Sequence, residues 1–179
     1  MRVITNESKE ENKKKEESSL TLESQTSESD QFNKSLVNEI ANELYGVNFY
    51  TSLGICFKTH GLCDIAKFYW KLAEKTMCIK GKIKEFLLMN EYCFCIPTIP
   101  EVSDCSEFKN AVDYENKRIE ELYKLDEKAP CTVTKGLVSK LIKKHMFLKH
   151  LTTLAFNISK NSSDLLLIQQ EISKLICDE

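Results

Sequence analysis

The sequence lacks several features that would assign it at once to a class of protein. No apolar run approaches the roughly 20 residues that a membrane-spanning helix needs. The formal net charge is only −2, so neither a nucleic-acid-binding face nor a strong field at a membrane surface is indicated. Met1-Arg2-Val3-Ile4 is followed at once by polar residues, so an apolar signal segment is absent. We therefore expect a cytoplasmic protein with neither nucleic-acid nor membrane partners.

The eight cysteines lack the spacing of a zinc or redox motif. Their one close pair is Cys93-Phe94-Cys95, which is not a C-x-x-C motif, and no second pair completes a four-ligand site. Free thiols are the expected state in a reducing compartment. We predict that these cysteines are unpaired and serve as small buried hydrophobic side chains.

The chain also lacks the alternation of β-strands and any internal repeat, and its periodic part has helical spacing. Residues 1–33 carry charges and serines but almost nothing to bury, which predicts a disordered charged tail. Residues 34–179 are long enough for one domain with a core. The predicted helices run from about Ser35 to Thr59, Cys63 to Met89, Ser103 to Lys128, Thr132 to Ile158 and Asp164 to Ile176.

The signals between these helices predict how they are connected. Ser35 is a plausible N-cap of the first helix, and Gly61 ends it because glycine adopts the left-handed conformation at little cost. Pro97 and Pro100 exclude a helix between the second and third helices and indicate an extended crossover. A short loop makes antiparallel neighbours, whereas a long crossover joins two such hairpins. The predicted fold is therefore all-α, a four-helix bundle with one long crossover and a short fifth helix.

An acidic residue interrupts the apolar stripe of the first predicted helix. The stripe consists of Leu36, Ile40, Glu43, Val47 and Tyr50. A carboxylate on a buried stripe is ionised only when a partner stabilises it, and its pKa otherwise rises. Glu43 is thus expected to be a metal ligand, half of a buried ion pair, or a remnant of an earlier site.

Short motifs along the helices occur in an order and spacing that resemble ferritin over about residues 35–177. Pro97 and Pro100 also fall where ferritins cross over, and residues 164–176 match the short fifth helix of the cage subunit. The resemblance implies the ferritin-like bundle fold. The motifs that carry it are Glu43-Leu44-Tyr45 with Tyr50, Ala66-Lys67-Phe68-Tyr69, Ala73-Glu74, and Ala111-Val112-Asp113-Tyr114-Glu115 with Ile119 and Leu122.

The resemblance also implies the position of a metal centre. Ferritins oxidise iron at a di-iron centre that takes a glutamate from each of two helices and a Glu-x-x-His pair from another. Position by position, the two glutamates are Glu43 and Glu115, and the glutamine usual on the fourth helix is replaced by His145. The Glu-x-x-His pair falls on Thr76 and Ile79, so two ligands are missing. The candidate metal ligands, with iron as the implied cofactor, are Glu43, Glu115 and His145.

Other iron-handling positions of the family are altered as well. The acidic cluster that seeds mineral on the inner surface falls at Lys75, Cys78 and Gly81. The carboxylates of the three-fold entry channel fall at Lys135 and Val138. A ring of lysines would repel the cations that an acidic ring attracts.

Three arrangements of the candidate ligands are compatible with the sequence. Two carboxylates and an imidazole suffice in principle to hold one divalent metal. Alternatively, His145 is protonated and paired with both glutamates in a metal-free cluster, with Tyr50 or Thr76 donating hydrogen bonds. In the third arrangement the helical register differs and one glutamate faces solvent.

Three functions remain open. The first is a ferritin-like iron-storage cage subunit that lacks ferroxidase activity and assembles alone or with an active ferritin subunit. The second is an active ferroxidase, against which the loss of ligands at Thr76 and Ile79 argues, because catalysis depends on fixed coordination geometry. The third is a repurposed helical bundle that binds no iron and serves as a structural or regulatory protein, with the charged tail as its tether.

Overall fold

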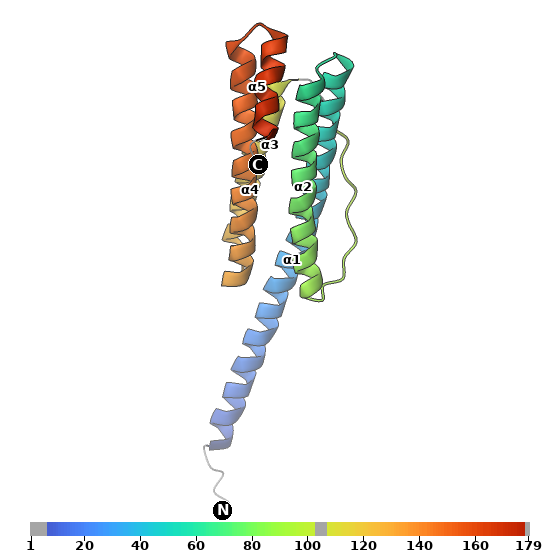
Figure 1. Ribbon diagram of the computed structural model, residues 1–179. Helices are drawn as coiled ribbons and strands as arrows, with labels where there is room; N and C mark the ends of the chain where they lie inside the picture. Colours follow the sequence, from blue (N-terminus) through green and yellow to red (C-terminus); the bar gives the residue numbers. More distant parts are fainter. Residues whose placement is uncertain (1–6, 103–106, 178–179) are drawn as a thin grey trace, which may run out of the picture.

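The computed structural model describes residues 7–102 and 107–177, with side chains over residues 28–102 and 107–175. All secondary structure in these residues is helical. α1 and α2 form one helical hairpin, α3 and α4 form a second, and the connection after α2 runs beside the bundle (Figure 1). The predicted all-α bundle with one long crossover and a short fifth helix is confirmed. Its helices are α1 (Glu7–Thr59), α2 (Cys63–Met89), α3 (Phe108–Glu127), α4 (Thr132–Asn161) and α5 (Leu165–Cys177).

The turn between α1 and α2 lies where the sequence predicts it. Gly61 has a φ of +79°, the left-handed conformation that glycine adopts without steric cost. The Leu62 N–H donates to the carbonyl of Phe57 at 3.0 Å and thereby satisfies a carbonyl at the helix end. The predicted bounds of α2 are confirmed, and so is the start of α4 at Thr132.

The start of α1 differs from the prediction. The helix begins at Glu7, and Ser35 lies inside it rather than at its N-cap. The Ser35 hydroxyl donates to the carbonyl of Gln31 at 3.1 Å, one turn earlier, so this serine is accommodated within a continuous helix. Phe32 is buried in the core, so packing begins before residue 34. That residues 1–33 act as a tail separate from the bundle stays a prediction.

Two further helix starts are shifted by local capping. α3 begins at Phe108 rather than at Ser103, which itself lies outside the described residues. Asn110 Oδ1 accepts the backbone N–H of Glu107 at 2.9 Å and so fixes the first turn of α3 there. α5 begins at Leu165, and Asp164 caps it by accepting the N–H of Leu166 at 2.9 Å.

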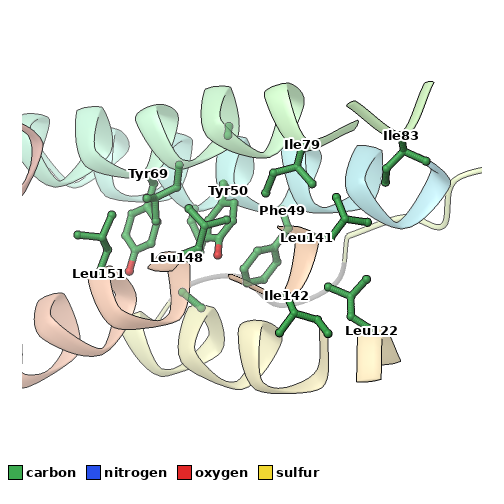
Figure 2. Packing of buried hydrophobic residues seen from close by; sticks show 14 of the residues in the cluster. Phe49, Tyr50, Tyr69, Ile79, Ile83, Leu122, Leu141, Ile142, Leu148 and Leu151 are labelled. Carbon is green, nitrogen blue, oxygen red and sulfur yellow. The ribbon is translucent and has the colours of Figure 1, made fainter. Parts of the chain in front are cut away.

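The core lies between the four long helices and is rich in aromatic side chains. Tyr50 of α1 and Tyr69 of α2 stack with ring centroids 6.2 Å apart, and Tyr69 also stacks on Phe57 at 5.4 Å. Figure 2 shows side chains from α1, α2, α3 and α4 directed into the same space. Packing of this kind, rather than helix propensity, supplies most of the stability of such helices.

α5 covers one end of the bundle and leaves part of its own surface apolar. It packs against α2 and α4, with Ile168 and Ile172 buried. Leu165, Leu166 and Leu167 remain 58%, 63% and 45% exposed. Over the part of the chain that the structure describes, no helix combines the length and the apolar character needed to cross a membrane.

The six cysteines whose side chains the structure describes are free, as predicted, but they are not buried. The six whose side chains are described form no disulfide. None of the six belongs to the core, so their interpretation as small buried hydrophobic residues is wrong. Helical periodicity places Cys56, Cys63 and Cys78 beside the apolar stripes rather than on them, and Cys93, Cys95 and Cys131 lie outside the helices. Cys105 lies outside the described residues. Cys56 and Cys63 are partly exposed, and Cys78, Cys93, Cys95 and Cys131 are exposed.

Candidate functional site

The three predicted ligands meet in the centre of the bundle. Glu43 of α1, Glu115 of α3 and His145 of α4 are each 0% exposed. His145 lies between the two carboxylates, with Nε2 3.0 Å from Glu43 Oε1 and Nδ1 2.8 Å from Glu115 Oε2. The alternative in which one glutamate faces solvent is therefore wrong. The contacts are those expected of the carboxyl–histidine cluster.

Tyr50 completes the environment of Glu115, whereas Thr76 does not contribute. The Tyr50 hydroxyl donates a short hydrogen bond to Glu115 Oε1, so both oxygens of this carboxylate have partners. Thr76 is also buried, but its hydroxyl donates to the carbonyl of Leu72 at 2.9 Å, within α2. Ile79 is 1% exposed and packs in the core. At Thr76 and Ile79, where the resemblance to ferritin predicts that two ligands are missing, α2 thus has a hydroxyl bonded to its own backbone and an apolar side chain.

Two charged residues that the sequence reasoning missed extend this cluster. Arg118 of α3 is 3% exposed, and its Nη2 lies 2.9 Å from Glu43 Oε1 and 2.5 Å from Glu39 Oε2. Its Nη1 lies 2.6 Å from Glu121 Oε2, at the edge of the bundle. We call Glu39, Glu43, Glu115, Arg118 and His145 the buried charge cluster.

Spacing along the helices contained a signal for both missed residues. Glu39 precedes Glu43 by one helical turn, and Arg118 follows Glu115 by three residues. Side chains at such spacings share a face of the helix. A charged residue next to an apolar stripe usually reaches solvent. The sequence alone therefore did not predict that Arg118 pairs with Glu39 and Glu43 inside the bundle.

The protonation of His145 follows from its partners. Ionised carboxylates only accept hydrogen bonds, so with both glutamates ionised the two ring nitrogens carry protons and the ring is an imidazolium. Burial is the largest influence and opposes this charge, but Glu43 and Glu115 raise the pKa of His145 to about 10. Burial likewise favours the neutral acid at Glu43, yet His145 and Arg118 keep the pKa of Glu43 below its usual range.

These residues, as they lie, do not fit a bound metal ion. A metal ligand must offer a lone pair, and a doubly protonated imidazole has none. The Oε1 of Glu43 already accepts from both Arg118 and His145, while its Oε2 is buried without a partner. Within the part of the chain described, no group of three or more His, Cys, Asp or Glu side chains is arranged to hold a metal. Metal binding by Glu43, Glu115 and His145 stays a prediction that requires His145 to lose a proton.

The other iron-handling positions lie apart from this cluster. Lys75 and Cys78 line a groove between α2 and α4, and Gly81 lines the depression beside it. Lys135 is exposed on α4, but Val138 is 0% exposed inside the bundle. Placing Val138 in a channel between subunits is therefore wrong, because the apolar stripe of α4 turns it into the core.

Comparison with known proteins shows the fold. The sequence matches no protein-family model and no curated protein. The structure is similar to an open-pore ferritin from Archaeoglobus fulgidus, with a TM-score of 0.73 at 15% identity over 80% of this chain and 96% of that one. A humanized archaeal ferritin gives 0.74 at 16% identity, and M. penetrans ferritin gives 0.73 at 15%, each over 80% of this chain and 94% of its own.

Proposed function

We infer the role of this chain from its ferritin-like fold together with the residues buried in its bundle. We propose that it is a cytoplasmic, ferritin-like cage subunit that contributes to the shell of an iron-storage assembly and has no ferroxidase centre of its own. It assembles with copies of itself or with an active ferritin subunit, and iron is the cargo of the assembly. The single observation that carries the proposal is the buried charge cluster.

In this cluster two positively charged side chains, Arg118 and His145, neutralise the carboxylates that would otherwise be available to bind a metal. Arg118 contacts Glu39 and Glu43, and His145 contacts Glu43 and Glu115. Buried charges persist when they are paired and hydrogen-bonded in this way. The carboxylates of Glu43 and Glu115 thus have a structural role: their ion pairs join the helices of the bundle. Because they are used in this way, they do not form a centre that oxidises iron.

Features outside the cluster support assembly rather than a free monomer. The first turn of α5 presents three adjacent leucines to solvent. They are Leu165, Leu166 and Leu167, which are 58%, 63% and 45% exposed. Adjacent exposed leucines are typical of a surface covered by another chain. In a shell, such a helix end gains a partner from a neighbouring subunit.

Iron oxidation and native mass, measured on the full purified chain, test the proposal together. We expect a large closed assembly that does not oxidise Fe(II) faster than buffer does in the presence of oxygen, while an active ferritin measured in parallel does. Rapid oxygen-dependent oxidation that disappears in Glu43→Gln would contradict the proposal. A matched Glu121→Gln variant, which changes a carboxylate at the exposed end of the Arg118 contacts, is the control.

A second function, a repurposed bundle without iron, is favoured by one observation. α4 carries six lysines and no acidic residue, which is a poor surface for collecting iron cations. Native mass spectrometry with metal analysis separates the two functions. A small oligomer free of iron after expression in iron-rich medium supports the repurposed bundle, whereas a closed shell supports the cage subunit.

A further inference from the structure

Positive charge is concentrated on two helices that lie on one side of the molecule. α2 carries six lysines and three acidic residues, and α4 carries six lysines and no acidic residue. The chain as a whole has a net charge of −2, so the remaining segments are acidic. Figure 1 shows α2 and α4 in front, with the upper part of α1 and α3 behind them. A field of this kind attracts anions to one face of the bundle.

A groove opens between these two helices. Its volume is about 540 Å³, within the range of small-molecule sites. Ile79 and Leu148 form an apolar floor, each 1% exposed, and Phe147 is 42% exposed in the groove. Lys75 Nζ lies 5.5 Å from the centre of the Phe147 ring, so a cation already sits over this aromatic side chain. The groove therefore offers both an apolar surface and positive charge.

Lysines converge at the rim of the groove from both helices. Lys143 and Lys144 of α4 line it with Lys75 of α2. Burial, followed by the like charge of Lys82, lowers the pKa of Lys144. Two neighbouring amines repel one another when both are charged, and a doubly charged acceptor close to both removes that repulsion.

The arrangement differs from that of lysines elsewhere on the surface. Lys67, Lys71 and Lys174 each pair with a carboxylate three residues away on their own helix. Among the residues that the structure describes, no carboxylate forms an ion pair with Lys82 or Lys144. Lys82 and Lys144 thus carry positive charge, in and beside the groove, that no described carboxylate neutralises.

We propose that this groove, which we call the α2–α4 groove, binds a phosphate-bearing small molecule. Lys143 and Lys144 of the groove lining hold the phosphate oxygens, Lys82 adds its charge from the depression beside the groove, and Phe147 with the apolar floor holds a ring or chain attached to the phosphate. Lysine is well suited to this role because its ammonium acts as a mobile point charge with three donors. The proposal concerns a single subunit and goes beyond the cage function, so it does not depend on assembly or on iron.

Calorimetric titration of the full chain at fixed ionic strength tests the site with two probes, ATP and inorganic tripolyphosphate. We expect saturable binding of both, with ATP binding more tightly because its base adds contact with Phe147. Phe147→Ala should then weaken ATP binding while leaving tripolyphosphate binding unchanged. If tripolyphosphate binds as tightly as ATP, the role proposed for Phe147 and the apolar floor is wrong.

The matched variants separate a built site from diffuse surface charge. The double variant Lys82→Gln with Lys144→Gln should weaken the binding of both probes at least tenfold. The control, Lys140→Gln with Lys160→Gln, removes the same charge from exposed positions of α4 outside the groove. Lys160 also lies over an aromatic ring, with its Nζ 4.4 Å from the centre of the Phe156 ring. It should change affinity less than threefold.

Equal weakening in the two double variants, or no saturable binding of either probe by the wild-type chain, would overturn the proposal. Circular dichroism of each variant checks that the helices are retained. Sulfate at the same ionic strength measures the contribution of general screening.

Discussion

The interior of this bundle and the surface between α2 and α4 arrange positive charge in opposite ways. Inside, Arg118 and His145 form ion pairs with the carboxylates of Glu39, Glu43 and Glu115, which come from α1 and α3. On the surface, burial and then the like charge of Lys82 lower the pKa of Lys144, and no described carboxylate pairs with either lysine. Charge that is neutralised by the chain stabilises the chain, whereas charge left without a counter-charge is available to a ligand. The cluster is thus a structural element and the groove a candidate binding site.

The largest loss of stability should come from removing the buried cation Arg118. Arg118→Met leaves Glu39 and Glu43 buried with one cation fewer, and removing one partner of a buried pair costs roughly 3–5 kcal/mol. Urea denaturation monitored by circular dichroism gives the free energy of unfolding. Glu121→Gln is the matched control: this carboxylate contacts the same guanidinium but its side chain is 34% exposed, so the loss should stay below about 1 kcal/mol. Equal losses in both variants would contradict a special role for the interior.

The charge of His145 should make stability depend on pH. Because the native pKa of His145 is raised from 6.5 to about 10, the native state holds this proton more tightly than the unfolded state does. Its contribution is complete below about pH 6.5 and is lost as the pH rises to about 10, with a slope of at most about 1.4 kcal/mol per pH unit. Urea denaturation of the wild type and of His145→Gln at several pH values measures this slope, which the variant should lack.

The acid limb has the opposite sign. The pKa of Glu43 is lowered from 4.5, chiefly by His145 and Arg118 acting against the larger effect of burial. Its contribution to stability is present above pH 4.5 and is lost as the pH falls below that value.

A wild-type chain as stable at pH 10 as at pH 6, with no difference from His145→Gln, would show that His145 is neutral.

Two buried tyrosine hydroxyls, one with and one without a hydrogen-bond partner, should contribute differently to stability. Tyr50→Phe removes the hydrogen bond to Glu115 and should cost about 1.5–3 kcal/mol, since the acceptor is charged. Tyr69 is the matched control because it is equally buried and its hydroxyl has no partner. Tyr69→Phe should leave the midpoint of urea unfolding unchanged or raise it. A larger loss for Tyr69→Phe than for Tyr50→Phe would reverse the account.

The smallest effect is expected on the surface side. Lys144→Gln removes the repulsion between Lys144 and Lys82 and should raise the free energy of unfolding by about 0.5 kcal/mol or less, because solvent screens charges near the surface. Thermal unfolding at low and high salt provides the measurement, and the gain should shrink as salt is added. Lys160→Gln, on the same helix, should show no such gain. A loss of stability in Lys144→Gln that salt does not change would mean that this lysine supports packing instead.

Much of the fold was predictable because helical periodicity reports burial directly. The stripe through Glu43 and Tyr50, the glycine turn at Gly61 and the bounds of α2 all follow from residues a few positions apart. The burial of Glu115 and His145 was predictable for the same reason. The start of α1 was not, because a serine such as Ser35 can cap a helix or hydrogen-bond to the preceding turn.

The composition of the candidate site was only partly predictable. Positions matched to ferritin identified Glu43, Glu115 and His145, but a partner that belongs to no ligand motif is invisible to such matching. Arg118 reaches Glu43 across the bundle from a different helix, so its pairing depends on how α1 and α3 pack. The exposure of the cysteines was missed for a related reason, since residue type alone does not determine which side of a helix faces the core.

The central claim is that a cation of the chain, His145, occupies the space between Glu43 and Glu115. Nitrogen NMR of the labelled imidazole at pH 7.5, before and after one equivalent of Zn²⁺, tests this claim most directly. Two protonated ring nitrogens whose shifts do not change when zinc is added are the expected result. A neutral ring with one nitrogen that shifts on zinc addition, and no longer shifts in Glu43→Gln, would contradict the claim and restore the metal site.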